Sequence, residues 1–207
     1  MKWNIDNIGF LHQPEYFLGT FDIPQMQERH EKELEKSLNA LKTSLNNEVD
    51  PLKALQLLHR KDHVQFLLNN MEEFRQNNRL EESVIELYTR ENGPFSSGGD
   101  STLWERFFNE CDRTKLHKLG KPFPAHVKKV FRGSVSGFMR SLAWTPDMKM
   151  VEKFADRWKN PAMGGGELYE VEISQKDVLV YMQIKHEEIV FISPEFIHTA
   201  EIKPFSS

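Results

Sequence analysis

The apolar residues of this chain change their spacing near Pro124, and that change restricts the folds open to it. Before Pro124 they recur three and four residues apart, as in the stripe from Leu34 to Leu45, which is the period of an amphipathic helix. After Pro124 they form short runs or alternate with polar residues, which is the period of strands. We therefore predict an α+β protein with a helical region, residues 1–120, and a compact β-rich region, residues 121–207.

Local signals predict where the helices of the first region begin. Asp22 is a candidate N-cap of a first, highly charged helix, and Asp50-Pro51 restarts the helical pattern. A further helix is expected over residues 80–89. The composition of residues 92–99 is typical of a loop, and a fourth helix follows from Thr102 and ends in the segment from residue 118 to 124. The charged residues of the first helix are expected to form a solvated face.

The second region is predicted to contain one helix among short strands. Asp147 is a candidate N-cap for the helix, whose apolar residues run to Trp158. The expected strands cover residues 130–132, 142–145, 167–173, 178–181, 188–192 and 197–202.

Composition and charge narrow the classes of function. The chain has 207 residues and a formal net charge of −4, of which residues 1–120 carry −5 and residues 121–207 carry +1. Neither region would hold nucleic acid by charge alone, although local binding of a nucleic acid stays open. The chain has no apolar run long enough to cross a membrane, no signal-peptide core and one cysteine, Cys111, predicted to be a small core residue. We expect a cytoplasmic protein, or one delivered into the cytoplasm of a target cell.

The pair His59 and His63 has the spacing with which two histidines share a metal on a helix. Arg60 stands where a zinc hydrolase would carry glutamate, and no third ligand is evident. We expect no metal site.

Four motifs in the second region place polar groups at the ends of apolar runs. An arginine, a hydroxyl and a carboxylate at strand edges can converge on one cleft, as an anionic, glycosidic substrate requires. The motifs are Val130-Phe131-Arg132-Gly133, Ser141 to Thr145 leading into Val151-x-x-Phe154-Ala155, Gly166-Glu167-Leu168-Tyr169-Glu170-Val171, and Glu188-Ile189-Val190-Phe191.

In this order, over about residues 125–203, the motifs resemble the mono-ADP-ribosyltransferase family of the arginine–serine–glutamate type. The resemblance implies an ADP-ribosyltransferase-like β-sandwich core that uses NAD as substrate. Such an enzyme cleaves the nicotinamide–ribose bond and transfers ADP-ribose to a protein side chain or a nucleic acid. By analogy it would be a bacterial or phage toxin or effector. We recognise no family resemblance in residues 1–120, which would recognise the target, dock a partner or inhibitor protein, or cover the site.

The resemblance assigns catalysis to Glu188, whose carboxylate would stabilise the oxocarbenium-like ribose. His186 and Glu187 precede it on the loop expected to meet the acceptor. His186 stands where the family often has glutamate or glutamine; it would act as a general base or have no role. Trp144 and Phe154 would stack on nicotinamide or belong to the core.

NAD binding is assigned, again by resemblance, to Arg132 with the adjoining Gly133 and to the hydroxyls of Ser141 and Thr145. A guanidinium fork suits a phosphate or the adjoining ribose. Ala143 stands where the family has its first strand serine, so Ser141 would substitute. The structural alternatives are an ordinary strand-end arginine for Arg132, a solvated strand edge for Glu188 and a helix-start residue for Thr145.

Two other functions stay open beside the transferase. An NAD glycohydrolase would use the same residues with water as the acceptor. A catalytically degenerate relative would keep the fold as a binding module.

Overall fold

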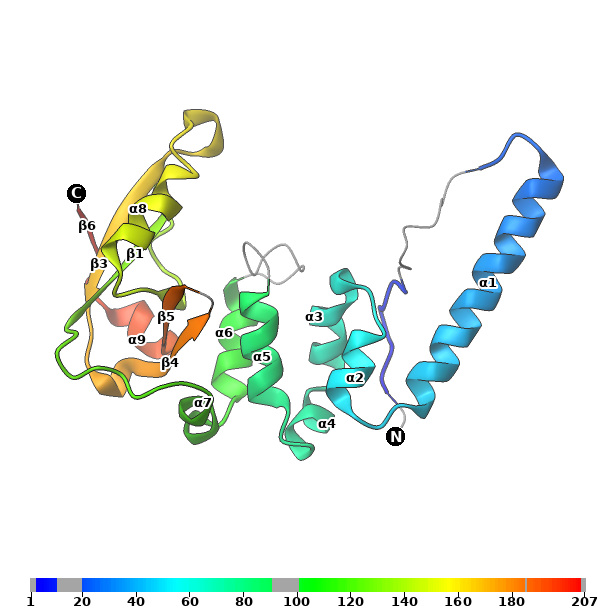
Figure 1. Cartoon of the computed structure of the whole chain (residues 1–207), viewed down its shortest axis with the longest axis horizontal. Helices are drawn as coiled ribbons and strands as arrows, with labels where there is room; N and C mark the ends of the chain where they lie inside the picture. The colour runs from blue at the N-terminus through cyan, green and yellow to red at the C-terminus, as the bar shows by residue number, and fades with distance from the viewer. Residues whose placement is uncertain (1–2, 11–19, 91–100, 185, 206–207) are drawn as a thin grey trace. The chain divides into compact units, whose positions relative to one another are not determined.

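The computed structural model describes residues 3–10, 20–90, 101–184 and 186–205 (Figure 1). The chain divides into two compact units, Met1–Asp100 and Ser101–Ser207, which we call unit one and unit two and describe separately. Within the described ranges, no helix combines the length and the apolar character needed to cross a membrane.

Unit one is helical. The helix predicted over residues 80–89 is confirmed at both ends, and the Asp50 cap is confirmed because its side chain accepts hydrogen bonds from the Leu52 and Lys53 amides. The predicted Asp22 cap is wrong: the first helix begins at Pro24, after Ile23, which offers no side-chain acceptor. The helices are α1 (Pro24–Asn47), α2 (Pro51–Gln56), α3 (Arg60–Asn69), α4 (Met71–Gln76) and α5 (Leu80–Thr89).

Aromatic packing and a pair of amide hydrogen bonds hold the first residues of the chain to these helices. The Trp3 ring lies 5.4 Å from Phe66 and 6.4 Å from Phe74, centroid to centroid, and all three side chains are buried. Asn4 and Asn70 bond reciprocally: the Asn4 amide donates to Asn70 Oδ1 at 2.7 Å, and Asn70 Nδ2 donates to the Asn4 carbonyl at 2.8 Å. Burial of aromatic rings with satisfied polar groups accounts for the order of this segment.

The two histidines singled out by spacing have separate structural roles. His59 caps α3, with its ring nitrogen accepting from the Lys61 amide. His63 is buried, with Nε2 3.0 Å from the Leu58 carbonyl and Nδ1 3.0 Å from Arg90 Nη1. Because a guanidinium only donates, Nδ1 must accept, and the ring is neutral. No group of three metal-ligating side chains occurs among the described residues.

We expect the stability of unit one to fall as the pH drops through the range of His63. Burial lowers the pKa of His63 below its ordinary value, so the unfolded chain binds a proton that the folded unit excludes. Stability is therefore full above the unfolded pKa of about 6.5 and is lost below it. Thermal unfolding between about pH 5 and pH 8 measures this dependence. His63→Gln should flatten it, and an unchanged slope would show that another group is responsible.

Unit two contains two small antiparallel sheets with helices, so the α+β class is confirmed. The sheets have the orders β1-β3-β6 and β2-β5-β4. The Phe131 amide donates to the Thr145 carbonyl at 2.7 Å and the Thr145 amide to the Phe131 carbonyl at 3.0 Å, which joins β1 to the end of β2. The strands are β1 (Lys129–Val135), β2 (Ala143–Trp144), β3 (Gly166–Glu172), β4 (Val178–Ile184), β5 (Glu187–Ile192) and β6 (Lys203–Phe205); the helices are α6 (Ser101–Glu110), α7 (Arg113–Leu119), α8 (Met148–Asp156) and α9 (Pro194–Thr199), with 3-10 turns η2 (Pro161–Met163) and η3 (Gln175–Asp177).

In unit two, one predicted helix start is confirmed and one predicted strand is replaced by a helix. The Asp147 cap is confirmed by the hydrogen bond from the Lys149 amide to its Oδ1. The strand predicted over residues 197–202 is wrong, because Ser193 caps α9 through its Oγ and Pro194 opens that helix. The strand follows instead, as β6.

The first two helices of unit two complete its core. Trp104, Phe107 and Phe108 are buried, and the Phe108 ring stacks on Phe191 of β5 at 5.3 Å. Cys111, predicted to be a core residue, is only half-buried. The segment from residue 101 to 119, predicted to belong to the helical region, thus packs with the strands. The core cluster is Val130, Trp144, Tyr169, Val171, Ile173, Val178, Val190, Ile192 and Ile197.

Helix α8 approaches β1 and β3 closely through glycines (Figure 1). A Cβ at Gly133 would lie 2.2 Å from the Val151 carbonyl oxygen and 2.6 Å from the Ala155 nitrogen. A Cβ at Gly166 would lie 2.1 Å from the Ala155 carbonyl oxygen. All these atoms belong to helix backbone, so the contact distance leaves no room for a larger residue at either position.

Gly133→Ala is therefore expected to destabilise unit two by about 1–3 kcal/mol, because α8 must move to admit the methyl group. Denaturant unfolding followed by tryptophan fluorescence measures the change. Gly137→Asn is the matched control: Gly137 has φ 81°, which asparagine tolerates, and a Cβ there meets nothing within 4 Å. A Gly133 variant as stable as the Gly137 variant would contradict the close contact.

Candidate functional site

A groove of about 490 Å³ lies where the two sheets of unit two meet, and this volume is in the range of small-molecule sites. The walls of the groove come from both sheets, from the loop before β1 and from Pro146, which lies between β2 and α8. The lining residues are Pro124, His126, Val127, Lys129, Phe131, Pro146, Tyr181 and Glu188.

Glu188 is the one predicted site residue in the wall of this groove. It is half-buried on β5, with Gln183 of β4 as its cross-strand partner. The Tyr181 hydroxyl is hydrogen-bonded to the Glu188 side chain, and burial first, then this hydrogen bond, raise the pKa of Tyr181. Tyr181 therefore keeps its proton at neutral pH, and its hydroxyl can donate to the Glu188 carboxylate.

Two aromatic rings flank the groove and are themselves held by other rings. Phe131 meets Phe205 edge to face, with centroids 5.6 Å apart. Tyr181 meets Phe123 in the same way at 5.7 Å. Both rings are half-buried and line the groove, so part of each is open to a planar heterocycle such as nicotinamide or a nucleobase.

Arg132 lies next to Phe131 on β1, so its side chain leaves the strand on the opposite face. Its Nη1 donates to the Ala143 carbonyl at 3.0 Å, and its Nη2 lies 3.5 Å from the Ser134 hydroxyl. The residues that line the groove do not include Arg132. Its guanidinium ties β1 to β2 and in this way holds Phe131 in place.

The two hydroxyl residues assigned to the ribose are not among the residues that line the groove. Thr145 is buried, and its Oγ1 accepts a hydrogen bond from the Asp147 amide at 3.1 Å. This is the helix-start geometry of the structural alternative. Ser141 is half-buried, and its carbonyl accepts from Trp144 Nε1 at 2.7 Å. Pro146, which follows Thr145 directly, reaches the groove wall in their place.

The other predicted cofactor residues are not among the residues that line the groove. Trp144 is 2% exposed within the core cluster, so the stacking role is corrected to a core role: no face of the indole is accessible to nicotinamide. Phe154 is half-buried on α8, with the Arg157 guanidinium 5.0 Å from its ring. Gly133 permits the close approach of α8.

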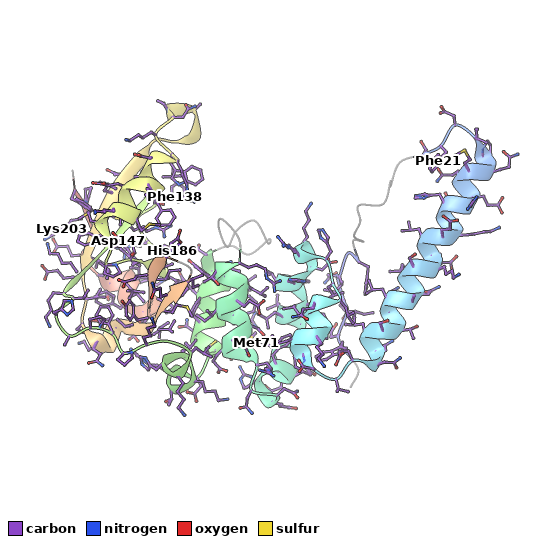
Figure 2. The ribbon with its side chains drawn as sticks, viewed as in Figure 1. Phe21, Met71, Phe138, Asp147, His186 and Lys203 are labelled. Carbon is purple, nitrogen blue, oxygen red and sulfur yellow. The ribbon has the colours of Figure 1, made fainter. Side chains whose placement is uncertain are left out.

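His186 and Glu187 lie at the turn that joins β4 to β5, where Figure 2 labels His186. His186 is exposed, and Glu187 is half-buried opposite Ile184. Alternation along β5 directs Glu187 and Glu188 to opposite faces of the strand. Lys185 lies outside the described residues.

The Tyr169 motif builds the turn after β1. The Tyr169 hydroxyl donates to the Glu167 carboxylate and accepts from the Gly137 amide at 2.6 Å. Burial, with a smaller contribution from the Glu167 hydrogen bond, raises the pKa of Tyr169 to about 12. The motif thus stabilises the turn that follows β1, the strand that carries Arg132.

The sequence reasoning missed Tyr181, Phe131, Lys129 and His126 as groove residues. Strand alternation carried a signal for two of them: if one face of β1 holds Val130 and Arg132, the other holds Lys129 and Phe131. Tyr181 could have been suspected as the polar end of an apolar run. His126 carried no signal, because a loop residue is placed by the sheets on either side of it.

Comparison of the chain with models of known protein families, with curated proteins and with solved structures found no match.

Proposed function

We propose that unit two is an NAD-dependent mono-ADP-ribosyltransferase. The observation that carries the proposal is Glu188, a half-buried carboxylate in a groove where two antiparallel sheets meet. It interacts with the Tyr181 hydroxyl and lies in a wall shared with Phe131. The order of the four sequence motifs is the second support.

The chemistry needs one fixed carboxylate. The bond between the nicotinamide nitrogen and the ribose C1′ breaks, and its electron pair leaves with nicotinamide, which becomes neutral. C1′ passes through an oxocarbenium-like state, which the Glu188 carboxylate stabilises by charge. A nucleophile on the acceptor then bonds to C1′ and gives up its proton. Phe131 and Tyr181 supply faces for the planar rings of NAD.

Arg132 enters the proposal as a positioning residue. Nη1 of its guanidinium fork holds the Ala143 carbonyl and so keeps β1 against β2. Phe131 of β1 and Pro146, which follows β2, both line the groove. Contact of its guanidinium with an NAD phosphate stays a prediction of the resemblance. Arg132→Lys separates the two roles, because lysine can pair with phosphate but lacks the fork that spans the strands.

The test is NAD carrying a label on its adenine, incubated with the purified chain in the presence of cell lysate. Nicotinamide release with label in a macromolecular fraction supports transfer. Release with all label in free ADP-ribose supports a glycohydrolase. A folded chain that neither releases nicotinamide nor incorporates label, at any NAD concentration, contradicts the proposal.

A further inference from the structure

A stretch of unit two carries positive charge without any acidic residue. No aspartate or glutamate occurs between Asp112 and Asp147. The part of this stretch that precedes the body of β1, residues 113–129, we call the basic segment. Its cations are Arg113, Lys115, Lys118, Lys121, Lys128 and Lys129. All of them except Lys115 are exposed.

The fold brings the basic segment to the groove. It comprises α7, pairs with β4 where the Lys121 amide donates to the Tyr181 carbonyl at 2.7 Å, and ends at the first residue of β1. His126 and Lys129 lie in the groove wall itself. The part of the segment from Lys121 to Lys129 therefore borders the groove that contains Glu188, Phe131 and Tyr181.

The positive charge of the segment is only partly neutralised. Lys129 forms an ion pair with Glu170 at 2.8 Å. Lys121, in contrast, donates to a neutral amide, with its Nζ 3.1 Å from Gln183 Oε1. Charges further away than about 8 Å are largely screened at physiological salt, so the net charge of −4 on the chain does not cancel this local field.

We propose that the basic segment binds the sugar–phosphate backbone of a single-stranded nucleic acid. Exposed lysines along a chain that ends at aromatic rings suit a strand whose phosphates follow the cations and whose unstacked base packs on Phe131 or Tyr181. A duplex keeps its bases stacked and cannot present one to the groove. The inference deepens the proposed function by naming the acceptor class, and it rests on that function only for the transfer step, not for binding.

Fluorescence anisotropy of a labelled oligouridine RNA of about 20 nucleotides tests the proposal, with the whole chain titrated at several salt concentrations. The segment variant combines Lys118→Gln, Lys121→Gln and Lys128→Gln. The control variant removes the same charge elsewhere in unit two, through Lys153→Gln, Lys159→Gln and Lys176→Gln, at three exposed positions outside the groove wall.

We expect the segment variant to bind at least about 10-fold more weakly than the unsubstituted chain. The slope of log affinity against log salt should fall by about 2, since each phosphate contact on a single strand contributes roughly 0.7. The control variant should stay within about 3-fold of the unsubstituted chain, since a distant charge acts only through the screened field. The titrations contain no NAD, so RNA binding is measured apart from NAD turnover.

Four results would overturn the inference. The first is an equal loss of affinity in the two triple variants, and the second is RNA binding that shows no salt dependence. A polyglutamate peptide of similar length binds as tightly as the RNA, which would indicate an acidic protein partner. Saturating NAD displaces the RNA, and the segment variant loses affinity for NAD by the same factor as for RNA. This result would assign these cations to NAD binding. RNA binding without nicotinamide release would leave the inference standing and remove the proposed function instead.

Discussion

Glu188→Gln is expected to lower nicotinamide release from NAD by at least about a hundredfold while the fold is kept. The substitution retains shape and hydrogen bonding but removes the charge that would stabilise the oxocarbenium-like ribose. Loss of one such electrostatic contact costs about 2–3 kcal/mol of transition-state stabilisation. Initial rates at saturating NAD, with circular dichroism to confirm folding, measure the effect.

Glu187→Gln is the matched control for this experiment. It removes the same charge from the neighbouring residue, which alternation places on the other face of β5. We expect its nicotinamide release to stay within a few-fold of the unsubstituted chain. Tyr181→Phe, which removes the hydroxyl that interacts with Glu188, should give an intermediate loss. Equal losses in the Glu187 and Glu188 variants would mean that net charge at the turn, not a positioned carboxylate, governs the rate.

Trp144→Ala is expected to destabilise unit two by about 3–5 kcal/mol, since it removes a large buried ring and leaves a cavity. Trp144 is 2% exposed among the core residues, and its indole nitrogen satisfies the Ser141 carbonyl. Guanidinium unfolding, with the transition followed by circular dichroism, measures the loss. A stacking residue for nicotinamide would behave differently: stability would hardly change and the KM for NAD would rise.

Phe154→Ala provides the comparison for Trp144→Ala. Phe154 is half-buried on α8, where one side of its ring contacts the Arg157 guanidinium. We expect it to lose about 1 kcal/mol, the centre of the range for point substitutions in general. If both variants unfold at the same denaturant concentration, the distinction drawn between core and surface aromatic residues is wrong.

Hydrophobic period and capping chemistry predicted where several elements lie, but not the breaks that separate α2, α3 and α4 or those that separate α6 and α7. The Asp50 and Asp147 caps and the helix at residues 80–89 depend on contacts within one turn of helix, which a local pattern contains. The same reasoning failed for residues 197–202. Their apolar positions fit a strand, and the decisive signal lay just before them, in Ser193 and Pro194.

The candidate site was predictable only in part. Glu188 could be proposed because a carboxylate at the start of an apolar strand is visible in sequence. Trp144 and Thr145 were assigned to NAD by the same motif order, yet the first lies in the core and the second supports the start of α8. Which face of a strand meets the groove depends on long-range pairing, here Phe131 with Thr145, and sequence spacing does not contain that information.

The packing of α6 against the strands has a practical consequence for dividing the chain. A fragment that began at residue 121 would keep both sheets, the groove and every residue assigned to NAD. It would also uncover Phe191, which the Phe108 ring covers in the intact unit. An exposed aromatic strand surface of this kind promotes aggregation. The shortest fragment suited to expression therefore begins at or before Ser101, where the second compact unit starts.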